Sequence, residues 1–145
     1  MHKLLQKIFV QRAELKLSLA IVLLVTPTQT SIASVLPLEL IQLPPGFSIQ
    51  TFATEVPNAR AMAVGDNDTL FVGSRSAGNV YALIDLDQDM RSDRIYVIAK
   101  GLHAPSGVAF YDDALYVSAV DRILRYDNIE SQLESPPSPI IVTSA

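Results

Sequence analysis

From residue 45 onward the chain alternates short runs of hydrophobic residues with short polar turns. Residues 47–52 alternate apolar and polar side chains, which is typical of a half-buried strand. Further apolar runs at 61–64, 70–73, 80–84 and 94–98 are separated by turns rich in Gly, Asp, Asn and Ser. No segment of this part keeps an apolar spacing of 3.6 residues, and only residues 128–133 hint at a short helical turn. The pattern predicts an all-β protein.

The predicted strands then occur a second time, at residues 107–110, 115–118 and 122–126. The two sets correspond at a spacing of 43 to 46 residues, as in Ala63 and Ala109, Val72 and Val117, and Val80 and Ile123. A repeat of about 40–50 residues built from four short strands is typical of β-propeller blades. We therefore predict about two blades of a β-propeller. The alternative is a small all-β domain whose halves resemble each other by chance.

Two blades are too few to close a propeller, which needs at least four blades of about 40 residues each. Each blade depends on its neighbours to cover the faces of its sheet. Residues 136–142, with the sequence PPSPIIV, are interpreted as a connection and the opening strand of a third blade. We expect a truncated propeller domain over residues 45–145, with apolar faces left exposed.

The first 33 residues have the order of a secretory signal peptide. Basic residues precede an apolar run at 17–25, and Ser31 and Ala33 place small side chains where cleavage after Ala33 requires them. The run is shorter than the roughly 20 residues that span a bilayer. We predict a secreted or periplasmic protein, with residues 34–44 as a leader to the first strand. The alternative is an uncleaved segment that anchors the chain, which would be its one contact with a membrane.

Composition excludes several kinds of chemistry. The 145 residues include no cysteine and two histidines, so disulfides and cysteine nucleophiles are excluded. The formal net charge of −4 argues against a nucleic-acid partner, which a basic patch would attract. No P-loop, G-x-S-x-G or H-E-x-x-H motif occurs.

Six segments carry a more specific signal: LPPGFSI at 43–49, VPNARAMA at 56–63, LFVGSR at 70–75, GNVY at 78–81, GLHAPSGVAF at 101–110 and RILRY at 122–126. In order and spacing they resemble the start of the glucose/sorbosone dehydrogenase family, and the L-sorbosone dehydrogenase type most. The resemblance covers roughly residues 43–142.

This resemblance implies a six-bladed propeller, when complete, that holds pyrroloquinoline quinone (PQQ) together with calcium. It also implies an exported oxidoreductase that oxidises a sugar or sugar-derived aldehyde and passes electrons to an external acceptor. In the family, the base histidine and the main calcium ligands come from later blades, so the present chain is expected to be inactive. The alternative function is a non-catalytic propeller that binds a ligand or a protein, because fold alone does not decide activity.

Three residues are candidates for cofactor binding. Arg60 stands where the family's first innermost strand begins, and a guanidinium pairs well with a carboxylate of the quinone. His103 holds the matching place in the second blade, and Asn58 is a weaker candidate beside Arg60. Their alternative roles are a structural arginine that binds loop carbonyls, a loop histidine, and turn chemistry at the asparagine. No catalytic residue is predicted in this chain.

An aspartate-rich loop is the candidate metal site. Asp85, Asp87, Asp89 and Asp93 resemble the alternating carboxylates of a calcium loop. Met90 stands where such a loop needs glycine, and Tyr96 where it has glutamate. The alternative is a solvated acidic loop, with Arg91 and Arg94 neutralising the aspartates.

Overall fold

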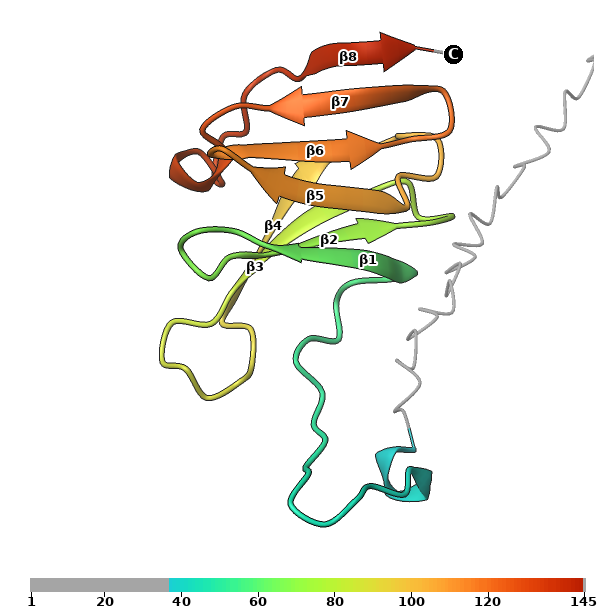
Figure 1. Cartoon of the computed structure of the whole chain (residues 1–145), viewed down its shortest axis with the longest axis vertical. Coiled ribbons are helices and arrows are strands. Elements are labelled where there is room, and N and C mark those ends of the chain that lie inside the picture. The colour runs from blue at the N-terminus through green and yellow to red at the C-terminus, as the bar shows by residue number, and fades with distance from the viewer. Residues whose placement is uncertain (1–36, 145) are drawn as a thin grey trace, which may run out of the picture. The chain divides into compact units, whose positions relative to one another are not determined.

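The computed structural model describes residues 37–144, which form two four-stranded antiparallel sheets (Figure 1). The strand orders are β1-β2-β3-β4 and β5-β6-β7-β8, so each sheet follows the order of its strands along the chain. The helical elements of the described residues are two 3₁₀ turns, η1 at Leu38–Leu40 and η2 at Ile129–Ser131. The all-β prediction is confirmed. The segment predicted as a signal peptide lies outside the described residues.

Sheet 1 is a meander of four short strands. Its bounds are β1 at Ala59–Val64, β2 at Leu70–Ser74, β3 at Val80–Ile84 and β4 at Arg94–Ala99. The turn after β1 places Asp68 at φ 59°, and the turn after β2 places Gly78 at φ 68°. Aspartate and glycine tolerate this left-handed backbone better than most residues, so the polar turns of the sequence become the corners of the meander.

Sheet 2 repeats this plan. Its bounds are β5 at Gly107–Tyr111, β6 at Ala114–Ser118, β7 at Arg122–Tyr126 and β8 at Ile140–Ser144. Asp112 and Asp113 form the two-residue turn between β5 and β6, with φ of 51° and 59°. Two successive positive φ values are typical of the tight hairpin turn that matches the twist of antiparallel strands. The helical turn expected within residues 128–133 is η2.

The strand predicted at residues 47–52 is wrong. These residues form no strand, and residues 47–50 are exposed. A strand is stable only where a neighbouring strand takes up its backbone hydrogen bonds, and no strand of the described chain pairs with this segment. Phe52, Ala53 and Val56 instead pack onto the outer face of sheet 1, against Val72, Tyr81 and Leu83.

The main hydrophobic core lies between the two sheets. Phe71, Val80 and Ala82 of sheet 1 pack with Leu115, Val117 and Leu124 of sheet 2, and Ile129 and Leu133 close the cluster at η2. The rings of Phe71 and Phe110 stack across the interface, with centroids 5.7 Å apart and planes 8° from parallel. Gly73 allows close approach, because a Cβ there would lie 2.5 Å from the carbonyl oxygen of Pro105.

The sheets meet through their first strands. β1 and β5 are neighbours across the interface and run in the same direction (Figure 1). The chain segments that enter β1 and β5 therefore lie at one end of the two sheets, and this end carries the candidate cofactor residues. Among the described residues no helix is long and apolar enough to cross a membrane.

Candidate functional site

Arg60 sits on a β-bulge at the start of β1. Ala59 pairs with Ser74 and Ala61 with Gly73, so the ladder skips Arg60. A bulge turns a side chain away from the regular alternation of the strand, and such bulges are frequent next to functional sites. Arg60 is exposed, and no ion pair or hydrogen bond of its guanidinium is recorded within residues 37–144. Its five N–H donors are available to an anionic ligand.

Asn58 is held by the turn between β2 and β3. Its side-chain oxygen accepts a hydrogen bond from the Ser76 hydroxyl, with the two oxygens 2.6 Å apart. Its carbonyl oxygen accepts a hydrogen bond from the backbone N–H of Arg75 at 3.1 Å. The residue has φ of 57°, which asparagine tolerates well. Asn58 thus positions the entry to β1, and this turn role is the alternative that the sequence left open.

His103 lies in the loop between β4 and β5 and is exposed. Its carbonyl oxygen accepts a hydrogen bond from the backbone N–H of Val120 at 2.9 Å, which fixes the loop against the β6–β7 turn. In that turn, a hydrogen bond from Arg122 lowers the pKa of Asp121, and the charge of His103 adds a smaller effect in the same direction. The backbone of His103 is thus held in place, while its imidazole lies at the surface.

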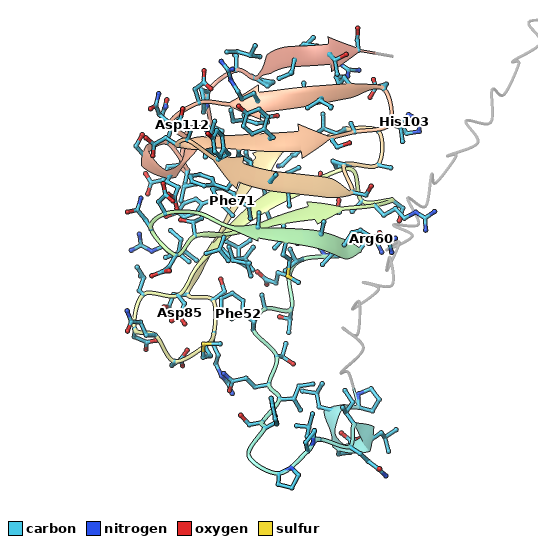
Figure 2. The ribbon with its side chains drawn as sticks, in the orientation of Figure 1. Phe52, Arg60, Phe71, Asp85, His103 and Asp112 are labelled. Atoms are coloured by element: carbon cyan, nitrogen blue, oxygen red, sulfur yellow. The ribbon has the colours of Figure 1, made fainter. Side chains whose placement is uncertain are left out.

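Arg60 and His103 lie at the same end of the two sheets, as Figure 2 shows. Arg60 lies at the start of β1 and His103 lies just before β5, and these two strands are neighbours. The structure thus places the two side chains on one rim, but records no bond between them. A guanidinium and an imidazole on one rim suit a ligand with several carboxylate groups.

Three aspartates converge in the loop between β3 and β4. One carboxylate oxygen from each of Asp85, Asp87 and Asp89 lies within 4.8 Å of the others. The backbone N–H of Met90 donates to Asp85 Oδ2 at 2.9 Å, and that of Asp89 donates to Asp87 Oδ1 at 3.2 Å. Met90 adopts φ of 67°, the conformation for which glycine is preferred at this place of a calcium loop.

The aspartates have no cationic partner in the described structure. The ion pairs recorded within residues 37–144 join Arg122 to Asp121 and Arg125 to Asp127, so neither Arg91 nor Arg94 forms an ion pair with this loop. Oδ1 of Asp85 is buried and has no hydrogen-bond partner among the residues that the structure describes. A hydrogen bond with Tyr96 is instead the main reason why the pKa of Arg94 lies above its ordinary value.

Asp93, the fourth predicted ligand, does not belong to the converging group. Its Oδ2 accepts a hydrogen bond from the backbone N–H of Leu86 at 2.7 Å, and its own N–H donates to the carbonyl of Ile84 at 2.8 Å. Asp93 therefore closes the base of the loop at the start of β4. The side chain of Gln50 fastens the tip, because its amide donates to the carbonyl oxygens of Asp89 and Met90 at 3.1 Å.

The cofactor candidates and the metal candidates lie at opposite ends of sheet 1. Ala59 pairs with Ser74 at one end of the sheet, whereas Ile84 pairs with Arg94 at the other, directly before the aspartate loop. Figure 2 shows this separation between Arg60 and Asp85. The two groups therefore do not form one site.

Glu130 makes a polar contact that the sequence did not suggest. From η2 its carboxylate accepts hydrogen bonds from the backbone N–H and the side-chain amide of Asn67, at 3.1 to 3.2 Å. Glu130 also lines a pocket of about 480 Å³ with Tyr96 and Glu134. Asn67 and Glu130 are 63 residues apart, and no local motif signals their contact.

The chain is similar to a bacterial protein over part of its length. An uncharacterized protein of Borreliella burgdorferi is 28% identical over 94 residues, which cover 64% of this chain and 23% of that protein. The matched part thus spans about a quarter of the relative's length. No family model matches the chain, and no solved structure matches it.

Proposed function

We propose that the chain is the N-terminal part of an exported, PQQ-dependent dehydrogenase that oxidises a sugar or a sugar-derived aldehyde. In this proposal the two sheets are the first two blades of a six-bladed propeller. The observation that carries the proposal is the placement of Arg60 and His103 on one rim, at the entries of two neighbouring first strands. The family resemblance across residues 43–142 supplies the chemistry.

The residues of the rim fit the charge of the cofactor. PQQ carries several carboxylates, and the exposed guanidinium of Arg60 offers the planar pair of donors that binds such a group. His103 offers one further donor from the adjacent loop. Asn58 fits less well, because its side-chain oxygen already accepts the Ser76 hydroxyl. Its expected role is therefore to hold the backbone next to Arg60.

When bound, the quinone supplies the redox chemistry, and the protein supplies orientation and charge. In this chain, Arg60 would bind and orient a carboxylate of the cofactor at the rim. The aspartate loop lies at the far end of sheet 1, so calcium beside the quinone would need ligands from outside this chain. The base that takes the substrate proton is likewise expected outside residues 1–145.

The test uses the complete protein that begins with this chain, loaded with PQQ and calcium. We expect it to reduce an artificial electron acceptor with an aldose or an aldehyde as substrate. Arg60→Ala should raise the dissociation constant for PQQ about tenfold or more, as loss of a charge-assisted hydrogen-bonded pair does. Equilibrium dialysis measures this constant without relying on turnover. Arg91→Ala is the matched control, because Arg91 is also exposed but lies in the aspartate loop.

Two results would overturn the proposal. The first is a complete protein that binds PQQ no better than an unrelated propeller does. The second is an equal loss of PQQ affinity in Arg60→Ala and Arg91→Ala. Binding of a ligand without reduction of any acceptor would favour the non-catalytic binding module.

A further inference from the structure

The two ends of the sheets carry opposite charge. Antiparallel strands place successive turns at alternate ends, so the rim consists of residues 57–60, 75–79, 100–106 and 119–122. Each of the four turns at the opposite end carries at least two acidic residues, and Figure 2 shows Asp112 there, away from Arg60. The rim carries one acidic residue, Asp121, and four basic ones: Arg60, Arg75, Lys100 and Arg122.

Most of the positive charge of the rim faces solvent. The ion pair recorded at this end joins Arg122 to Asp121, and within residues 37–144 none is recorded for Arg60, Arg75 or Lys100. All three of these side chains are exposed. The chain as a whole has a formal net charge of −4, so the basic rim is not a consequence of overall composition. It is a local feature of the fold.

Backbone hydrogen bonds hold the segments of the rim together. The N–H of Arg75 donates to the carbonyl oxygen of Asn58 at 3.1 Å, and that of Leu102 donates to the carbonyl oxygen of Gly78 at 2.9 Å. The bond from Val120 to the carbonyl oxygen of His103 adds the β6–β7 turn. The four segments are thus joined in series. A surface with a fixed backbone loses little conformational entropy on binding a partner.

The rim is too wide for one small ligand. Along sheet 1 its charges run from Arg60 on β1, through Arg75 after β2, to Lys100 after β4. Neighbouring strands lie about 4.8 Å apart, so the three steps from β1 to β4 span about 14 Å. A single sugar ring is narrower than this span. Further blades of a propeller would pack on the faces of the sheets, and the turns of the rim would stay open to a macromolecule.

We propose that the rim binds the electron acceptor of the dehydrogenase, and that this acceptor is a redox protein with an acidic contact surface. The inference rests on the proposed function, which places the cofactor at the rim. Oxidation of one aldose to its lactone releases two electrons and two protons. Two acceptor molecules take one electron each in successive encounters, and the protons pass to water.

The composition of the rim favours a protein over an anionic membrane. Segments that bind to membrane surfaces combine basic residues with aromatic ones, and the rim contains no aromatic residue. Val120 is 64% exposed and supplies an apolar contact between the polar turns. Electron-transfer complexes use small interfaces of less than about 1,200 Å². Opposite charges raise the rate at which such partners meet by about 10- to 1,000-fold, and salt reduces the effect.

The experiment uses the complete protein, loaded with PQQ and calcium and supplied with an aldose in excess. Stopped-flow absorbance follows the reduction of plastocyanin, a small acidic copper protein. At low ionic strength, Arg75→Glu and Lys100→Glu should each lower the second-order rate constant about threefold or more. At an ionic strength of about 0.5 M the difference should fall below about twofold, because salt screens exposed charges. Arg91→Glu is the matched control and should leave the rate constant unchanged, since it makes the same change of charge at the opposite end.

Turnover with p-benzoquinone separates this inference from the proposed function. This acceptor is uncharged and takes both electrons and both protons, so all the variants should reduce it equally well. A complete protein that reduces no acceptor would overturn the proposed function, and this inference with it. Normal turnover of benzoquinone, with equal plastocyanin rates in Lys100→Glu and Arg91→Glu, would overturn the inference alone. The same holds if Lys100→Glu abolishes binding to phosphatidylglycerol vesicles and leaves the plastocyanin rate unchanged, which would assign the rim to a membrane surface.

Discussion

The carboxylate of Glu130 receives both the backbone N–H and the side-chain amide of Asn67, with heavy-atom distances of 3.1 to 3.2 Å. This contact joins the β1–β2 turn of sheet 1 to η2 beyond the third strand of sheet 2. Gly65 makes it possible, because a Cβ at that position would overlap the Glu130 carboxylate. The two sheets are therefore joined by polar bonds at this edge as well as by the hydrophobic core.

The Glu130 contact predicts that the effect of Gly65→Ala on the free energy of unfolding depends on whether Glu130 is present. In the unsubstituted chain, Gly65→Ala should lower the free energy of unfolding by about 1 kcal/mol, since it displaces the carboxylate and breaks its hydrogen bonds. In a Glu130→Ala background the same change should be neutral or slightly stabilising, because alanine reduces the entropy of the unfolded chain. Urea unfolding of the four chains measures both effects. Equal destabilisation in the two backgrounds would show that the contact is unimportant.

The stacked pair of Phe71 and Phe110 predicts a large loss of stability. Phe71 is fully buried, so Phe71→Ala should cost about 3–5 kcal/mol by leaving a cavity between the sheets. Phe47→Ala should cost no more than about 0.5 kcal/mol, because that ring is 72% exposed. Chemical denaturation monitored by circular dichroism compares the two. Similar midpoints for both variants would mean that the sheets do not pack as described.

The sequence predicted most of the strands because alternation and turn chemistry are local properties. The expected runs at 80–84 and 122–126 agree in both bounds with β3 and β7. The run at 47–52 failed because a strand also needs a partner, and periodicity carries no information on partners. The propeller, and the place of these two sheets within it, remain predictions.

The candidate residues could be predicted by type but not by arrangement. The sequence grouped Asp93 with Asp85, Asp87 and Asp89, whereas the structure separates it, because its carboxylate bonds to the backbone of Leu86. The sequence also offered Arg91 and Arg94 as partners of the aspartates, and no such ion pair is recorded in the described part. The contact of Glu130 with Asn67 could not be foreseen, because it joins residues 63 positions apart.

Calcium binding by the aspartate loop is testable on the full chain. Titration calorimetry with calcium chloride should detect a dissociation constant on the order of 10⁻⁴–10⁻³ M, since the loop lacks the usual glutamate ligand. Asp85→Asn should weaken binding at least tenfold. Met90→Gly should strengthen it, because glycine adopts the φ of 67° at this place without strain.

Asp112→Asn serves as the control for the calcium titration, because this aspartate lies in the turn between β5 and β6. It removes the same charge from the chain and leaves the aspartate loop intact. No heat of binding at millimolar calcium would exclude the site. The same conclusion would follow if Asp112→Asn weakened binding as much as Asp85→Asn does.

Tyr126 predicts how stability depends on alkaline pH. Burial raises the pKa of its hydroxyl above the ordinary value of 10.0, because the low-dielectric core disfavours the phenolate. A pKa that is higher in the folded state gives stability that is complete below pH 10 and is lost as the pH rises toward the folded-state pKa. The free energy of unfolding should therefore fall above pH 10, by at most about 1.4 kcal/mol per pH unit from this one group.

Tyr126→Phe should reduce that slope, whereas Tyr111→Phe should leave it unchanged, because Tyr111 is 73% exposed. Equal slopes for the two variants in urea unfolding between pH 9 and 11 would show that Tyr126 is not the group responsible.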